Sequence, residues 1–192
     1  AILADTLREA GLADTTLPLT TRGLLYSMVG LDPADPAHDY AIGRERLRTG
    51  PIEWESRALA DAAGGGNNLS TPRDLNRILE RIERREGFRP ASCEAMVDIM
   101  KRQKYNTIIP LHLPGDTEVA HKTGSIRGVR NDAGIVYAPH GPYLISLFSK
   151  RLGDQVAGAA GLAEVSKAIW EGFVGPIPPP RFGPADPEES SR

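Results

Sequence analysis

The sequence predicts an α+β fold in which helices pack on an antiparallel sheet. Apolar residues follow a helical period through most of the chain before Glu118, and the period becomes extended from Glu118 onward. Helical spacing then returns near the end of the chain, at residues 158–175. Several helices, then three strands, then one helix is an order typical of helices covering one face or both faces of a small sheet.

The first part of the chain contains several segments with helical signals. We expect helices at residues 1–11, from Thr20 or Thr21 to about residue 30, and in a short stretch that begins near Trp54 and ends in three glycines. The clearest helix follows Thr71, because Pro72 suits a first helical position and Asp74 completes a pattern like a capping box. Gly87 would end that helix. Residues 31–40 are rich in proline and aspartate and are expected to connect two helices.

The second part of the chain is expected to start with a helix capped by Ser92 and to continue as strands. Three runs have strand character, "EVAHKTG", "DAGIVYAP" and "YLISLFSK", and short turns between them predict an antiparallel meander. The helix at 158–175 would close the domain. We therefore place one domain at residues 1–175 and expect a disordered, proline-rich tail at residues 176–192.

Composition excludes several classes of function. The formal net charge of −2 leaves no basic excess for a nucleic-acid partner, and no apolar run approaches the roughly 20 residues that span a membrane. The single cysteine, Cys93, excludes an internal disulfide, and the four histidines lack metal-ligand spacing. We therefore expect no metal and no cofactor.

The strand that ends in Lys-Thr-Gly carries the most chemistry. Alternation places Ala120 and Lys122 on one face, and His121 and Thr123 on the other. Gly124 leaves room for a ligand to approach the backbone. An ammonium, a hydroxyl and backbone hydrogen-bonding groups suit a ligand that has a carboxylate and an amide, with the amide paired to the strand as an added strand would be. The alternative is a solvated lysine at the end of a hairpin.

The residues around this strand resemble a known family. The stretches "STPRDLNRIL", "SCEAMVDIMKRQ" and "IPLHLPGDTEVAHKTGSIRGVRNDAGIVY" follow one another at spacing similar to the C-terminal portion of class A β-lactamases and related penicillin-recognising serine hydrolases. The resemblance runs from about Leu3 to Val174, and the pair Asn131–Asp132 follows Lys-Thr-Gly at the family's usual distance. It implies a β-lactamase/transpeptidase-like fold.

The resemblance also implies a mechanism and roles for residues. In this family a serine attacks a carbonyl to give an acyl-enzyme, which water then releases. Lys122 would help to hold the substrate carboxylate and keep the protons of the site mobile, and Thr123 would hydrogen-bond the same carboxylate beside Gly124. The backbone N–H of Ser125 would be one of two oxyanion-hole donors. Arg127 and Arg130 would either help to bind an anionic substrate or be solvated turn residues.

Two features of the family's pattern are missing. No serine in the chain has a lysine three residues later, and there is no Ser-Asp-Asn or Ser-x-Asn motif. We therefore expect the N-terminal part of the fold, with the nucleophile, to lie upstream and to be absent from this chain. Glu55 falls near the position of the family's deacylation base, but Leu59 stands where an asparagine is usual, so Glu55 is either that base or a solvated glutamate on a short helix.

The sequence thus predicts the C-terminal part of a serine hydrolase that resembles class A β-lactamases. Its substrate would be a β-lactam or another acyl compound bearing a carboxylate, and the missing N-terminal half of the same domain is a further expected partner. The alternative is a non-catalytic penicillin- or peptide-binding or regulatory protein that retains the Lys-Thr-Gly strand. The resemblance implies a secreted or periplasmic location.

Overall fold

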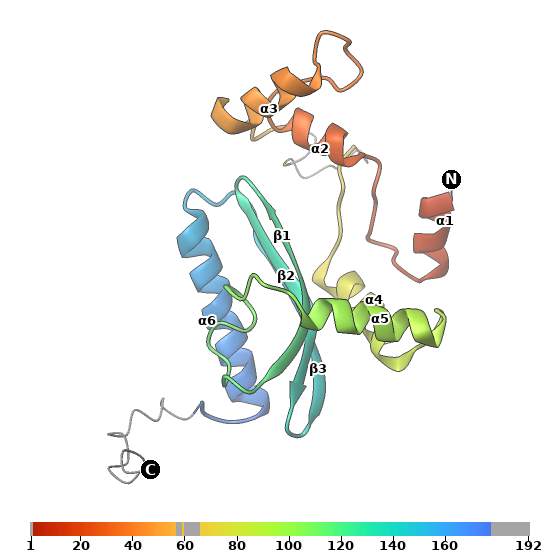
Figure 1. Ribbon diagram of the computed structural model, residues 1–192, viewed down its shortest axis with the longest axis vertical. Coiled ribbons are helices and arrows are strands. Elements are labelled where there is room, and N and C mark those ends of the chain that lie inside the picture. Colours follow the sequence, from red (N-terminus) through yellow and green to blue (C-terminus); the bar gives the residue numbers. More distant parts are fainter. Residues whose placement is uncertain (1, 57–58, 60–65, 178–192) are drawn as a thin grey trace, which may run out of the picture.

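A computed structural model describes residues 2–56, 59 and 66–177 of the 192-residue chain. Within these residues, helices precede the sheet and one helix follows it, as the sequence predicted (Figure 1). The elements are α1 (Ile2–Glu9), α2 (Thr21–Ser27), α3 (Tyr40–Thr49), α4 (Pro72–Arg84), α5 (Pro90–Lys101), β1 (Glu118–Ile126), β2 (Val129–Ala138), β3 (Gly141–Phe148) and α6 (Gln155–Phe173).

The three strands form one antiparallel sheet in the order β1–β2–β3. The pair Ile126–Val129 closes the first hairpin and the pair Ala138–Gly141 closes the second, so each turn contains two residues. In the described part of the chain, the outer edges of β1 and β3 are not paired with another strand. The meander is therefore confirmed, and its first hairpin extends closer to the turn than the sequence indicated.

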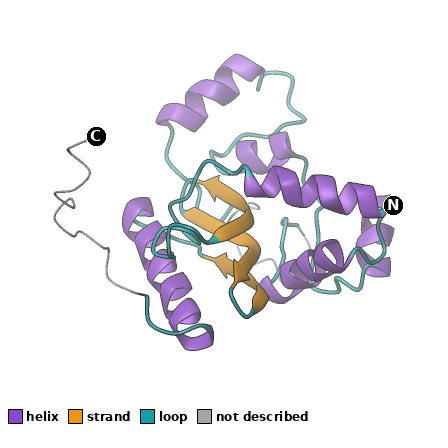
Figure 2. Cartoon of the chain, turned by 60° about the horizontal axis from the view of Figure 1, so that its bottom comes forward, coloured by secondary structure: helices purple, strands orange, loops and turns teal. Residues whose placement is uncertain are grey.

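Helices lie on both faces of this sheet. Figures 1 and 2 show α6 on one side of the strands and the pair α4–α5 on the other. Trp170 of α6 packs with Val119, Val136 and Ile145 on the first face, and Leu79 of α4 packs with Ala120 and Ile135 on the second. The two faces differ in sequence because successive side chains of a strand point to opposite sides.

The helices α2 and α3 cover the tip of the first hairpin (Figure 1). Arg127, in the turn, donates hydrogen bonds to the carbonyls of Gly50 (2.6 Å) and Leu47 (2.9 Å) at the C-terminal end of α3. Gly128 has a φ of +78°, and a Cβ there would lie 2.6 Å from the Trp54 ring, so glycine is required both by the backbone and by this contact. The hairpin tip is thus fixed by residues distant in sequence.

The helix α4 begins as its sequence predicts. Thr71 is the N-cap, and its hydroxyl accepts a hydrogen bond from the N–H of Asp74 (3.1 Å). The Asp74 side chain has a different role from the predicted capping box. Its carboxylate is buried and accepts hydrogen bonds from the N–H of Asp14 (3.0 Å) and the hydroxyl of Thr15 (2.8 Å). It therefore ties the segment after α1 to α4.

The structure corrects three local predictions. Residues 40–49 form α3, with Asp39 as N-cap, where only a connection ending at Tyr40 was expected. Ser92 does not cap α5, because that helix already begins at Pro90. The helix α4 ends at Arg84, before Gly87, with Arg85 in the left-handed conformation. Most of the short helix predicted after Trp54 and most of the tail predicted at 176–192 fall outside the described residues.

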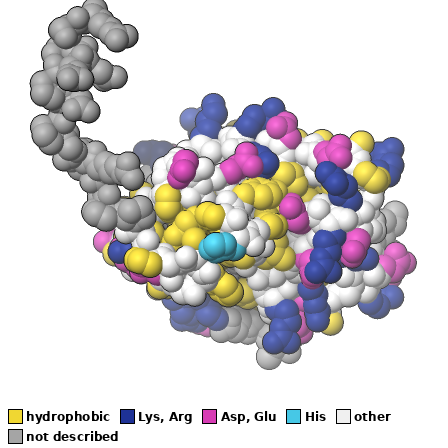
Figure 3. Space-filling view, turned by 90° about the horizontal axis from the view of Figure 1, so that it is seen from below, with side chains coloured by type: hydrophobic (Ala, Val, Ile, Leu, Met, Phe, Trp, Pro, Cys, Tyr) yellow, Lys and Arg dark blue, Asp and Glu magenta, His cyan; other side chains and the backbone are white. Residues whose placement is uncertain are grey.

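The surface of the described residues carries both apolar and charged regions. Apolar side chains gather on part of the face seen from below, and charged side chains cover much of the rest of it (Figure 3). None of the described helices combines the length and apolar character that a membrane span needs. Cys93 is buried and free, as expected of a structural cysteine.

We predict that Arg127→Ala lowers the free energy of unfolding by roughly 1–3 kcal/mol, because the last carbonyls of α3 lose charge-assisted hydrogen bonds. Urea unfolding followed by tryptophan fluorescence would measure the change. The matched control is Arg48→Ala, which removes an exposed ion pair with Glu45 within α3 and should change stability by about 0.5 kcal/mol or less. Equal effects of the two substitutions would contradict the role given to Arg127.

Candidate active site

The end of β1 nearest the hairpin turn brings polar groups to both faces of the sheet. Thr123 and Ser125 lie on the face covered by α6, beside Arg130, which is the cross-strand partner of Ser125. Lys122 and Gly124 lie on the face covered by α4 and α5. Burial follows the same alternation, since Ala120 is packed among residues of α4 and α5. The arrangement of faces predicted for Lys122 and Thr123 is therefore the one in the structure.

The outer edge of β1 is available to a ligand. The backbone N–H and C=O of Arg130 both bond to Ser149, on the side away from β1. In an antiparallel pair, the two opposed residues either exchange hydrogen bonds or both turn their backbone groups outward. Because Arg130 turns away from β1, the N–H of Ser125 points away from β2, toward the open edge.

Two cavities flank this edge. One of about 700 Å³ lies on the α6 side and the other, of about 500 Å³, extends toward the α4 side. Gly124, Ser125 and Asn131 line both, so the strand separates two spaces that meet at its edge. The first cavity also receives Thr123 and Arg130, and the second also receives Leu24, Leu59 and Phe148.

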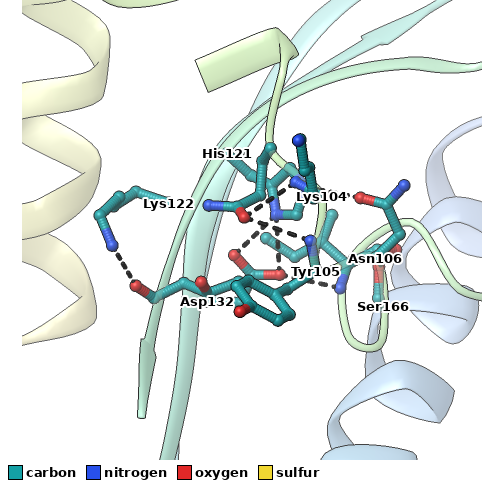
Figure 4. A network of polar contacts seen from close by, with 10 residues as sticks. Lys104, Tyr105, Asn106, His121, Lys122, Asp132 and Ser166 are labelled. Carbon is teal, nitrogen blue, oxygen red and sulfur yellow. Dashed lines mark hydrogen bonds and ion pairs between the residues drawn. The ribbon is translucent and has the colours of Figure 1, made fainter. Parts of the chain in front are cut away.

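Lys122 is exposed at the same edge. Its Nζ donates a hydrogen bond to the carbonyl of Thr123, and Figure 4 shows the side chain directed away from the neighbouring polar network. Among the described residues, no acidic side chain forms an ion pair with it. The ammonium is therefore free to bind an anion that reaches the edge of β1.

The polar network beside Lys122 is centred on a buried carboxylate. Asp132 is completely buried, and its oxygens lie 2.9 and 3.0 Å from Nδ1 of His121, which is only 2% exposed. The N–H of Ile109 donates to Asp132 (3.2 Å), and Nε2 of His121 lies 3.3 Å from Oδ1 of Asn106 (Figure 4). Both ring nitrogens of His121 thus lie within hydrogen-bonding distance of side-chain oxygens, which satisfies the buried imidazole and the buried carboxylate together.

The pair of His121 and Asp132 was not predicted from the sequence, although a signal was present. A two-residue turn at Arg127–Gly128 sets a register in which His121 faces Gly134 and lies diagonal to Asp132. Gly134 makes the space, because a Cβ there would lie 2.6 Å from that of His121. The structure places His121 in a buried pair with Asp132.

The remaining predicted site residues lie in different surroundings. Arg127 directs its guanidinium at the end of α3, away from the two cavities. Glu55 is about 80% exposed, pairs with Arg151 at 3.0 Å and lines neither cavity. Of the two arginines, the structure therefore brings only Arg130 to the end of the Lys-Thr-Gly strand. The described residues contain no group of three or more His, Cys, Asp or Glu that could hold a metal.

The chain has a β-lactamase/transpeptidase fold, with an antiparallel sheet between helical layers and an open Lys-Thr-Gly edge. A family model, "Beta-lactamase enzyme family", matches residues 3–173. The chain belongs to this β-lactamase enzyme family. None of the curated proteins matches the chain.

Solved structures show the same fold. A β-lactamase from Sphaerobacter thermophilus DSM 20745 is 23% identical, with a TM-score of 0.63. The match covers 92% of this chain and 54% of the β-lactamase chain. A representative class A β-lactamase from Bacteroides cellulosilyticus DSM 14838 is 22% identical, with a TM-score of 0.61. That match covers 87% of this chain and 51% of the other. PBP-A is 30% identical, with a TM-score of 0.53, and the match covers 69% of this chain and 51% of PBP-A. The chain thus spans about half the length of these proteins.

We predict that His121→Ala costs about 3–5 kcal/mol of stability, because it leaves the completely buried Asp132 side chain without its His121 partner. Adding Asp132→Asn should recover part of the loss, since a neutral amide is less costly to bury. The matched control is His112→Ala, because His112 pairs with Glu164 at 3.1 Å on the surface. That change should cost about 1 kcal/mol or less in the same urea titration. Similar losses at the two histidines would argue against a buried ion pair.

Proposed function

We propose that this chain forms the substrate-holding part of a serine hydrolase that opens β-lactam amides through an acyl-enzyme. The observation that carries the proposal is the open edge of β1, where Lys122, Thr123 and the outward-facing N–H of Ser125 meet in a member of the β-lactamase family. The proposal includes a secreted or periplasmic location, which is what the resemblance of the sequence implies. Support also comes from PBP-A, a variant of which was solved as an acyl-enzyme complex with penicillin G.

The geometry divides the substrate into two parts. A carboxylate at the edge can be reached by the hydroxyl of Thr123 from one face and by the ammonium of Lys122 from the other. Arg130, next along the face of Thr123, adds a second positive charge. The amide of the substrate would lie along β1 as an added strand does, which places its carbonyl oxygen near the N–H of Ser125. Such a donor stabilises the oxyanion that forms when a nucleophile attacks.

The nucleophile would come from outside the residues of this chain. None of its serines has the lysine three residues later that the family uses for activation. The cavity of about 500 Å³ on the α4 side is lined by both apolar and polar residues, among them Leu24, Phe148 and Asn68. An amphipathic helix from the complementary part of the fold would suit that cavity, and it would bring a serine to the edge of β1.

A non-catalytic binding protein is the second candidate function. The observation in its favour is that the chain carries the Lys-Thr-Gly strand but contains no Ser-x-x-Lys motif. The two candidates agree on the ligand and differ only in whether a nucleophile is supplied. Both therefore depend on the edge of β1.

The purified 192-residue chain is expected not to hydrolyse nitrocefin, because no serine in it has an activating lysine. The measurement is the absorbance change of nitrocefin at high protein concentration. Turnover that a serine-directed inhibitor abolishes would show that a serine of this chain acts as the nucleophile, contrary to the proposal.

In a form of the protein that carries the upstream half, Lys122→Ala should slow acylation about ten- to a hundredfold. The reason is the loss of one charge-assisted contact to the substrate carboxylate, worth roughly 1.5–3 kcal/mol. Lys122→Arg should be milder, since it keeps the charge. Stopped-flow mixing with a chromogenic β-lactam would measure acylation.

Glu55→Gln is the comparison for that experiment. If Glu55 orients the deacylating water, its loss should leave acylation unchanged and trap an acyl-enzyme visible by mass spectrometry. If Glu55 serves only its ion pair with Arg151, both steps should keep their rates. An unchanged acylation rate in Lys122→Ala would contradict the assignment of β1 to the active site.

A further inference from the structure

The outer face of α4 carries four arginines at helical spacing: Arg73, Arg77, Arg81 and Arg84. Residues three and four apart are neighbours on a helix surface, so these side chains form one row along α4. The opposite face of the helix is the one that packs on the sheet, through Leu79 and the partly buried Leu75. This row is named the arginine face below, and it points away from the sheet.

Charge is divided unequally between the two sides of α4. Six arginines and four carboxylates fall between residues 72 and 89, in a chain whose net charge is −2. Two of those carboxylates are directed into the protein, since Asp74 is buried and Glu83 accepts a hydrogen bond from Tyr137 of β2 (2.9 Å). Only Glu80 and Glu86 are left on the outer side, so positive charge predominates there.

The arginine face continues into the loop between α4 and α5. A Cβ at Gly87 would lie 2.9 Å from a guanidinium nitrogen of Arg81, so this arginine reaches the loop. Phe88 follows Gly87 and is 38% exposed, and Arg89 after it is exposed as well. An exposed aromatic ring therefore stands among cations at the end of the arginine face.

Three arginines of this surface have no acidic partner in the described part of the chain: Arg73, Arg81 and Arg89. Arg85, in the same loop, pairs with Glu94 of α5 at 3.2 Å. None of these arginines lines the two cavities beside β1, so their charge is separate from the candidate active site. Unpaired cations beside an exposed aromatic ring suit an anionic lipid surface, because the charges attract phosphates and the ring enters the interface.

We propose that the arginine face and Phe88 bind the surface of an anionic membrane. The guanidinium groups lie against lipid phosphates, and the Phe88 ring enters the boundary between headgroups and acyl chains. A membrane is favoured over a soluble anionic polymer because a polymer would leave the ring in water. The attraction is mainly electrostatic, so the binding is reversible and depends on salt. The inference does not depend on the proposed function, and its failure would leave that function standing.

The test is sedimentation of the full 192-residue chain with lipid vesicles. Vesicles of phosphatidylglycerol and phosphatidylcholine present an anionic surface, and vesicles of phosphatidylcholine alone are the neutral comparison. The chain should sediment with the anionic vesicles at low ionic strength and be released at high ionic strength, because salt screens exposed charges. Failure to sediment with the anionic vesicles, or equal sedimentation with both kinds, would overturn the inference.

Arg73→Gln combined with Arg89→Gln removes two unpaired charges from the proposed surface. An arginine near an anionic membrane contributes about fivefold to the partition coefficient, so this double variant should bind about tenfold more weakly or worse. The matched control is Arg44→Gln with Arg46→Gln, which removes two exposed arginines of α3. The control should change binding by about twofold or less. Equal losses in the two double variants would overturn the arginine face, since net charge alone would then account for the binding.

Phe88→Ser tests the apolar contact in the same assay. It should weaken binding by about fivefold or more, because the ring no longer leaves water. Tyr40→Ser is its control, since Tyr40 is an aromatic residue of α3 that is 80% exposed, and this change should have no effect. Far-UV circular dichroism would show that each variant is folded. Binding that Phe88→Ser leaves unchanged and soluble polyphosphate abolishes would overturn the membrane partner and indicate an anionic polymer.

Discussion

The buried charge of Asp132 is the constraint on which the rest of the site depends. A carboxylate removed from water must find hydrogen-bond partners within the protein, and two segments supply them directly. His121 contacts it from β1, and Ile109 donates an N–H from the loop after α5. The carbonyl of Ile109 accepts a hydrogen bond from Ser166, in the middle of α6 (2.8 Å). One buried group therefore holds β2, the loop and α6 in a fixed relation.

The same arrangement explains why the candidate site has a rigid frame and an open edge. The network of Asp132 fixes β1 on the side of α6, and the contacts of Arg127 and Gly128 fix the hairpin tip against α3 and Trp54. Between these two anchors, the outer edge of β1 is not paired with another strand in the described part of the chain, and the N–H of Ser125 points outward there. Positioned but unoccupied hydrogen-bonding groups are what a substrate amide and its oxyanion require.

Local signals allowed much of the fold to be predicted, and contacts between distant residues account for what was missed. The strands and α4 were found because their periods, caps and turns lie within a few residues of one another. The helix α3 escaped because its place depends on packing of Gly43 against Tyr26, a contact that no short window contains. For the site, alternation along β1 placed Lys122 and Thr123, but the partners of His121 and Arg127 required the register and the docking of α3.

The hydrogen bonds from Arg127 to the end of α3 bear on the order in which the chain folds. Both hairpins close across two residues, so the sheet costs little loop-closure entropy and can form early. The carbonyl that Arg127 binds on Gly50 lies 77 residues earlier in the sequence, and that contact closes a long loop. We therefore expect docking of α2 and α3 onto the hairpin to be a late event. The strand that carries Lys122 and Thr123 would then acquire its final surroundings only at that step.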